Sequence, residues 1–149
     1  MLKRTMTILI ISGLLILSGC SLISEVNSTV EYANEATEYI DTVQNFSNQL
    51  PALAGDAVTD EAARDTLETE LLAMKDEIET FNQIEPPSIA KDLHTQIVNS
   101  NAKLNEGIDL YLTNMENGVL DPAFLEETGV LTTITEITGL MENIQQLVN

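Results

Sequence analysis

The sequence has no tryptophan, a single cysteine, and only six lysine and arginine residues among 149 positions. One cysteine cannot form an intramolecular disulfide, so packing alone must hold the fold together. The shortage of bases leaves 24 aspartate and glutamate residues largely unopposed, at a formal net charge of −18. Because nucleic acid and anionic lipid surfaces repel such a polyanion, we expect no nucleic-acid partner.

The cysteine stands at position 20, directly after a segment typical of a secretory signal. Lys3 and Arg4 precede the run ILIISGLLIL, which is too short to cross a bilayer because crossing takes about 20 apolar residues. The stretch LSGC at 17–20 resembles the bacterial lipobox, in which the cysteine receives a diacylglyceryl group and the chain is cut before it. The alternatives are an ordinary secretory signal beside a coincidental cysteine and an uncleaved membrane helix.

We therefore predict a cleaved lipoprotein signal peptide at residues 1–19 and a single domain at residues 20–149, lipidated at Cys20. Two acyl chains, palmitate for example, give durable anchoring. We expect the protein at the cell membrane, on its extracytoplasmic face. All 24 acids but only four of the six bases follow Cys20, which gives the mature chain a net charge of −20. Attachment must come from the lipid and not from charge.

Four segments of the mature chain carry hydrophobic residues at helical spacing. The first predicted helix runs over residues 24–50, and Pro51 ends its regular pattern. Thr59 is the expected N-cap of the second helix, which stops before Pro86. The two predicted core stripes are Tyr32, Ala36, Tyr39, Val43, Phe46 and Leu50, flanked by Val26, Val30, Ala33 and Ile40, and then Ala63, Leu67, Leu71, Met74, Ile78 and Phe81.

Ser88 is the expected cap of the third helix, and Asn117-Gly118 supplies its stop. Asp121-Pro122 fits the start of the fourth helix, in which we expect a kink or break near Gly129. The predicted stripes are Ile89, Leu93, Ile97, Leu104, Ile108, Tyr111 and Met115, and then Val130, Ile134, Ile137, Met141, Ile144 and Val148. Together the four segments predict an all-α fold, an antiparallel four-helix bundle.

No grouping of side chains in the sequence predicts a catalytic, cofactor or metal site. His94 is the only histidine, and no carboxylate or thiol lies three or four residues away, where a helical metal ligand would be placed. We interpret it as a boundary residue beside Leu93. The methionines Met74, Met115 and Met141 and the tyrosines Tyr32, Tyr39 and Tyr111 fit core positions, with the tyrosine hydroxyls reaching the edge.

The third segment carries less charge than the others and is rich in amides. It holds Asn99, Asn101, Asn105, Asn114 and Asn117. This composition is consistent with a contact face around Asn101, Asn105 and Asn114, and equally with random variation on a solvated surface.

The mature chain as a whole resembles a family of small lipoproteins from Bacillus-like Gram-positive bacteria, a family whose domain has no assigned function. The stretches that carry the resemblance are LSGCSLISEVN, YANEATEYI, FNQIEPPSIAKDLHTQIV and GIDLYLTNMENGVLDP. The resemblance implies a helical domain anchored on the outer face of the membrane. It implies no functional residue beyond Cys20.

The function predicted from these features is non-enzymatic. We expect an interaction or envelope-support protein, attached to the membrane through a diacylglyceryl anchor, with another envelope protein as its partner. The alternative is a binding lipoprotein that holds a small ligand or cation between its helices. A cavity lined by Tyr32, Tyr39 and Tyr111 would favour that alternative. The sequence leaves the oligomeric state open.

Overall fold

The computed structural model describes residues 20–148, with side chains from residue 25 onward, and this range holds helices and no strand. The predicted signal peptide at residues 1–19 lies outside the described residues. The elements in chain order are α2 (Cys20–Ala57), α3 (Glu61–Asn82), the 3₁₀ turn η1 (Ser88–Ala90), α4 (Lys91–Glu116), α5 (Phe124–Glu127), α6 (Val130–Thr138) and α7 (Met141–Gln146).

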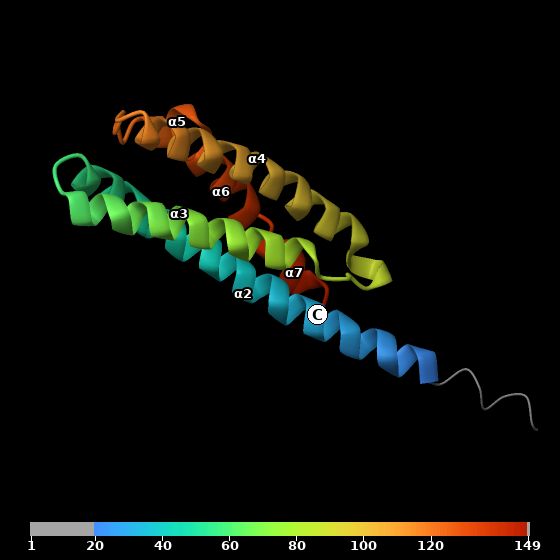
Figure 1. Cartoon of the computed structure of the whole chain (residues 1–149). Coiled ribbons are helices and arrows are strands. Elements are labelled where there is room, and N and C mark those ends of the chain that lie inside the picture. Colours follow the sequence, from blue (N-terminus) through green and yellow to red (C-terminus); the bar gives the residue numbers. More distant parts are fainter. Residues whose placement is uncertain (1–19, 149) are drawn as a thin grey trace, which may run out of the picture.

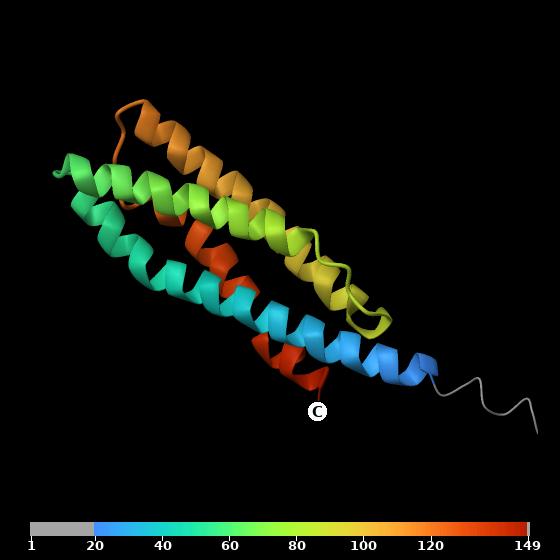
Figure 2. The ribbon, with the colours of Figure 1, turned by 60° about the horizontal axis from the view of Figure 1, so that its bottom comes forward.

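The helices run up and down in turn, as Figures 1 and 2 show. α3 returns along α2, α4 runs back beside α3, and the segmented stretch α5–α7 returns along α4 and α2. α6 contacts both α4 and α2, which closes the ring of helices around one core. The predicted all-α fold class is confirmed, and the arrangement is that of an antiparallel four-helix bundle whose fourth member is divided.

The core consists of the stripes predicted from the helical spacing. Tyr32, Leu71, Ile97 and Ile134 are all at most 2% exposed and represent the four sides of the bundle. Burial of such side chains contributes about 1.5–3 kcal/mol each. Four predicted stripe residues are exposed instead: Ile89 at 64%, Val26 at 58%, Val148 at 50% and Val30 at 44%.

Pro51 does not end the first helix, contrary to the prediction. α2 continues through it to Ala57, and the connection to α3 is only residues 58–60. Proline removes the N–H that would bind the carbonyl of Ser47, a loss that usually breaks a helix. Here Leu50, Ala54 and Ala57 are fully buried and extend the packing against α3. Tertiary packing therefore outweighs the lost hydrogen bond.

Two of the predicted helix caps are wrong. Asp60, one residue after Thr59, caps α3, and its carboxylate accepts a hydrogen bond from the Ala62 N–H at 2.9 Å. Ser88 does not cap α4, because its hydroxyl donates to the carboxylate of Glu25 and η1 intervenes.

The prediction of where the third helix ends and where the fourth begins is confirmed to within two residues. α4 ends with Asn117 as its C-cap, and Gly118 follows at φ 77°. The carboxylate of Asp121 accepts from the Ala123 N–H at 2.9 Å, as an N-cap does, although α5 begins only at Phe124.

The break near Gly129 is confirmed, because this residue has φ 75° and separates α5 from α6. A second break at Gly139-Leu140 separates α6 from α7 and was not predicted.

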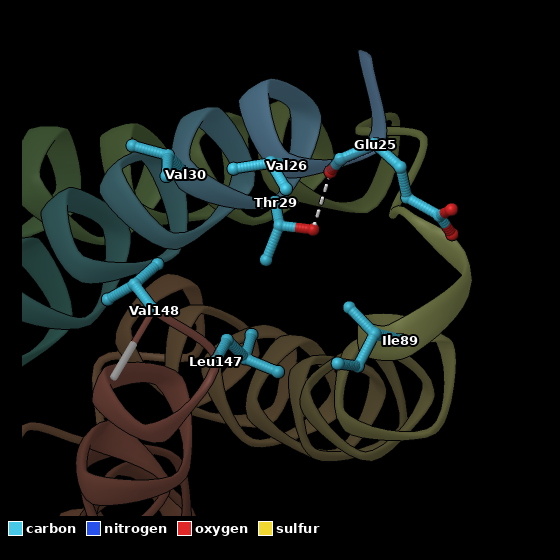
Figure 3. A pocket seen from close by; sticks show the side chains of 7 residues that line it. All are labelled: Glu25, Val26, Thr29, Val30, Ile89, Leu147 and Val148. Carbon is cyan, nitrogen blue, oxygen red and sulfur yellow. Dashed lines mark hydrogen bonds between the residues drawn. The ribbon is translucent and has the colours of Figure 1, made fainter. Parts of the chain in front are cut away.

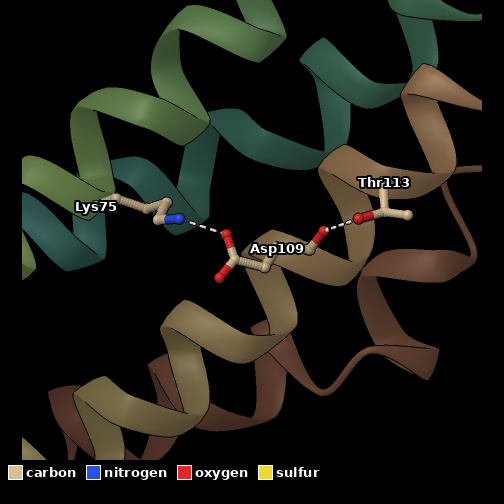
Figure 4. Close-up of polar contacts among 3 residues, drawn as sticks. All are labelled: Lys75, Asp109 and Thr113. Atoms are coloured by element: carbon tan, nitrogen blue, oxygen red, sulfur yellow. Dashed lines mark hydrogen bonds and ion pairs between the residues drawn. The ribbon is translucent and has the colours of Figure 1, made fainter.

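Two ion pairs join α4 to its neighbours. Lys75 of α3 pairs with Asp109, whose backbone carbonyl also accepts from the Thr113 hydroxyl at 2.8 Å (Figure 4). On the other side, Lys103 pairs with Glu136 of α6 at 3.1 Å. Both pairs are solvent-exposed, so each contributes at most about 1 kcal/mol.

Candidate functional site

The predicted lipidation residue, Cys20, is the first residue of α2. Its side chain lies outside what the structure describes. The helix runs without interruption from this position to Tyr32, the first large core residue. Twelve residues of helix span about 18 Å. A lipid at Cys20 would therefore be joined to the bundle by a helix and not by a flexible tether.

A row of buried polar and aromatic side chains crosses the interior between α2, α3 and α4. The Tyr32 hydroxyl lies 3.3 Å from His94 Nδ1, and the His94 ring lies 5.2 Å from the Phe81 ring. The Tyr39 ring stacks on the Phe81 ring, and their centroids are 4.3 Å apart. The Tyr39 hydroxyl donates to Asn101 Oδ1 at 2.5 Å.

Burial sets the protonation of this row. It raises the pKa of Tyr32 to about 12 and raises the pKa of Tyr39 further. Burial also lowers the pKa of His94, which is 8% exposed and therefore part of the core instead of the expected boundary. The tyrosines and the histidine are all neutral near pH 7. The row is thus suited to fixing the register of three helices.

Of the two interpretations of the amide-rich third helix, a contact face centred on Asn101 does not agree with the structure. Asn101 is fully buried, and its amide donates to Asn82 Oδ1 at 2.8 Å while its oxygen accepts from Tyr39. Asn105 and Asn114 are half-buried. Asn101, Asn105 and Asn114 therefore do not form an open surface for a partner.

The tyrosine hydroxyls also do not converge on one cavity. Tyr32 and Tyr39 bond to different residues, and Tyr111 borders neither of the hollows that these two tyrosines line. The Tyr111 hydroxyl has no hydrogen-bond partner within the described part of the chain. Its pKa is raised by burial and, to a smaller extent, by Asp121. Among the described residues no group of three or more His, Cys, Asp or Glu side chains could hold a metal ion.

The surface between α2 and α3 carries a furrow, which sequence reasoning missed. Three adjoining hollows of about 260, 300 and 280 Å³ form it, and neighbouring hollows share Glu35 and Glu77. Its acidic residues are Glu31, Glu35 and Glu38 of α2, Glu70 and Glu77 of α3, and Glu85. Its apolar and aromatic residues are Tyr32, Tyr39, Phe46, Ala73, Met74, Phe81 and Ile84. We call this feature the acidic furrow.

A separate hollow, of about 370 Å³, lies at the end of the bundle where α2 begins (Figure 3). Val26 and Val30 come from α2, Ile89 from η1, and Leu147 and Val148 from the chain after α7. Glu25 is its single charged residue. We call it the apolar groove.

The all-α bundle, with its first helix starting at Cys20, fits the class of small helical lipoproteins. Across residues 20–148 no helix is both long and apolar enough to span a bilayer. Residues 32–147 match DUF6376, a family of unknown function. The uncharacterized lipoprotein YybP of Bacillus subtilis strain 168 is 31% identical over 146 residues, covering 98% of this chain and 99% of the relative. No solved structure matches. The chain belongs to the DUF6376 family, which confirms the resemblance noted from the sequence.

Proposed function

We propose that this chain is a non-enzymatic, lipid-anchored interaction protein on the extracytoplasmic face of the membrane. Its acidic furrow receives a basic segment of another envelope protein. The observation that carries the proposal is the continuous helix from Cys20 into the bundle, because α2 also supplies one wall of the furrow. The similarity to a lipoprotein supports the anchor.

The composition of the furrow determines the kind of partner. Exposed carboxylates on both walls attract lysine and arginine and speed encounter with a basic segment. Apolar residues such as Phe81 and Ile84 can receive the aliphatic stems of those side chains. A basic protein segment offers both features, whereas an anionic wall polymer or lipid surface is repelled.

The anchor is tested at Cys20. Replacing Cys20→Ala removes the sulfur that would carry the diacylglyceryl group, so we expect no incorporation of labelled palmitate and no lipoprotein-type cleavage. Cells that express the unsubstituted chain provide the control. Continued labelling of the Cys20→Ala chain would show that the anchor lies elsewhere.

The furrow is tested by photo-crosslinking on intact cells. A photoreactive amino acid at Thr80, inside the furrow, should capture a protein partner. Thr135 of α6 is a matched control, since both threonines are exposed in helices and both hydroxyls bind the carbonyl four residues earlier. Equal capture at both positions would contradict a furrow-specific contact.

Charge reversal in the furrow gives the second arm of this test. The triple change Glu35→Lys, Glu38→Lys and Glu77→Lys should abolish capture from Thr80. The same change of net charge at Glu126, Glu127 and Glu142, all exposed on other helices, should leave it intact. Capture should also weaken between about 50 and 300 mM salt, because exposed charges are screened beyond about 10 Å at 0.1 M.

A further inference from the structure

The apolar groove arises because three hydrophobic stripes continue beyond the core at the same end of the bundle. α2 contributes Val26 and Val30, which are 58% and 44% exposed. Ile89 is 64% exposed and Val148 is 50% exposed, and both stand at the ends of other stripes. Figure 3 shows that these residues, far apart in the sequence, border one hollow. Apolar surface gathered in this way marks a contact with a partner or a membrane.

The position of the groove along the chain identifies what covers it. Val26 follows Cys20 by six residues of continuous helix, which is about 9 Å of rise. A lipid at Cys20 therefore holds the groove within reach of the headgroup region, where an apolar face buries about 5–10 Å deep.

The charge of the groove agrees with this placement. Glu25 is its only carboxylate, whereas the acidic furrow holds six. Because the groove itself presents a single carboxylate, it meets less repulsion from an anionic bilayer than the acidic furrow does. The exposed base Lys91 lies two residues after Ile89 and favours the same contact.

The groove is also held in shape by hydrogen bonds. The Ser88 hydroxyl donates to the Glu25 carboxylate, which ties η1 to the start of α2. The Thr29 hydroxyl donates to the Glu25 carbonyl at 2.8 Å. The α2 and η1 sides of the groove are therefore held in a fixed relation to each other.

We propose that the apolar groove is a membrane-docking surface, which rests in the interfacial region of the bilayer that holds the anchor. This inference rests on the lipid anchor of the proposed function. It gives the protein a defined orientation, with the end formed by the α2–α3 and α4–α5 connections pointing away from the membrane (Figure 1).

The test places a polarity-sensitive fluorophore on an introduced thiol in the full chain, expressed with its anchor. Ile89→Cys puts the label in the groove, and Val119→Cys puts it in the connection at the opposite end. Ile89 lies in η1 and Val119 lies in the α4–α5 connection, and both side chains are exposed. The purified proteins are reconstituted into phosphatidylcholine–phosphatidylglycerol vesicles that contain lipid with nitroxide-labelled acyl chains.

We expect the nitroxide lipid to quench the label at Ile89 several-fold more than the label at Val119. Because the fluorophore is itself apolar, a third protein combines Ile89→Cys with Val26→Glu and Val30→Glu, and we expect it to lose most of that quenching. Persistent quenching in this third protein would mean that the fluorophore partitions by itself, and the inference would be wrong.

Two further outcomes separate the failures. If the unsubstituted chain takes up the thiol label, Cys20 is free, so the anchor and this inference both fail. If Cys20 is blocked and the Ile89 and Val119 labels are quenched equally, the anchor stands and only membrane docking is wrong. A label at Ile89 that is shielded from aqueous iodide but not quenched by nitroxide lipid would show that protein covers the groove, for example a second copy of the chain, and would also exclude docking.

Discussion

The Tyr39 hydroxyl donates a hydrogen bond to Asn101 Oδ1 at 2.5 Å, which joins the middle of α2 to the middle of α4 inside the core. Asn101 is fully buried, and its amide also donates to Asn82 at the end of α3. One side chain thus connects three helices. Because buried polar groups are costly when unpaired, this arrangement favours one relative register of the helices.

The first prediction concerns this connection. Asn101→Leu leaves the Tyr39 hydroxyl and the Asn82 oxygen without their partner, so we expect the free energy of unfolding to fall by about 1–3 kcal/mol. Asn99→Leu on the exposed side of the same helix should change it by less than about 0.5 kcal/mol. Urea denaturation of both variants measures the difference. Equal effects at the two positions would show that the buried bonds contribute nothing.

The position of Asn101 shows what periodicity can and cannot predict. Ile97, residue 101 and Leu104 lie four and three apart on one stripe, so the spacing alone indicated burial at 101. The polarity of asparagine left two interpretations of this stretch open, a contact face and random variation on a solvated surface, and both placed residue 101 at the surface. A buried asparagine needs partners on other helices, and the pattern of one helix carries no information about them.

The second prediction concerns His94, which packs between Tyr32 and Phe81. Burial lowers the pKa of its imidazole below the usual 6.5, so in the acid range the unfolded chain binds more protons than the folded one. The stabilisation from neutral His94 is present above about pH 6.5 and is lost as pH falls toward the lowered pKa.

The measurement compares the unsubstituted chain with His94→Gln, which cannot titrate. As pH falls from 7.5 to 5, the unsubstituted chain should lose more free energy of unfolding than the His94→Gln chain. The comparison cancels the carboxylate contributions that the two chains share. A difference that stays constant across this range would contradict burial of the neutral ring.

The third prediction uses two glycines in opposite environments. Gly55 is an exposed position in α2 with open space around it, so Gly55→Ala should stabilise the fold by about 0.4–1 kcal/mol. A Cβ at Gly107 would lie 2.9 Å from the Thr128 carbonyl oxygen and 2.9 Å from a Val130 methyl group. Gly107→Ala should therefore destabilise the fold by about 1–3 kcal/mol.

Thermal melts followed by circular dichroism test this pair, and the two melting temperatures should move in opposite directions. A higher melting temperature for Gly107→Ala would mean that α4 and α6 do not approach each other as closely as the structure shows.

The fourth helix and the two surfaces illustrate the remaining limits of the sequence. Gly129 and the threonines around it indicated a break, because glycine readily adopts positive φ. The second break also has a glycine, Gly139, but its backbone is right-handed, so the readiness of glycine to adopt positive φ does not account for that break. The acidic furrow and the apolar groove depend on how helices are placed side by side, and Glu35 and Glu77 meet only through that placement. Of the candidate functional features, only the motif at Cys20 is local enough to be recognised from the sequence.

The last prediction concerns the charge of the whole bundle. Only two of the four bases after Cys20, Lys75 and Lys103, form ion pairs within residues 25–148, against 24 acids. Repulsion among the remaining carboxylates opposes the compact state, and salt screens it over a distance that shrinks from about 30 Å at 0.01 M to about 3 Å at 1 M. We expect the melting temperature to rise with sodium chloride between about 10 mM and about 500 mM, a range over which screening goes from weak to strong.

A charge-neutralised chain separates this effect from general salt effects. Glu35→Gln, Glu38→Gln and Glu77→Gln remove three exposed carboxylates that line one furrow. This chain should melt at a higher temperature than the unsubstituted chain at low salt and should gain less from added salt. Chloride is used because sulfate strengthens the burial of apolar surface in any protein. If both chains gain equally from sodium chloride, the carboxylates of the furrow do not repel one another in the folded state, and the attraction of that furrow for a basic segment loses its physical basis.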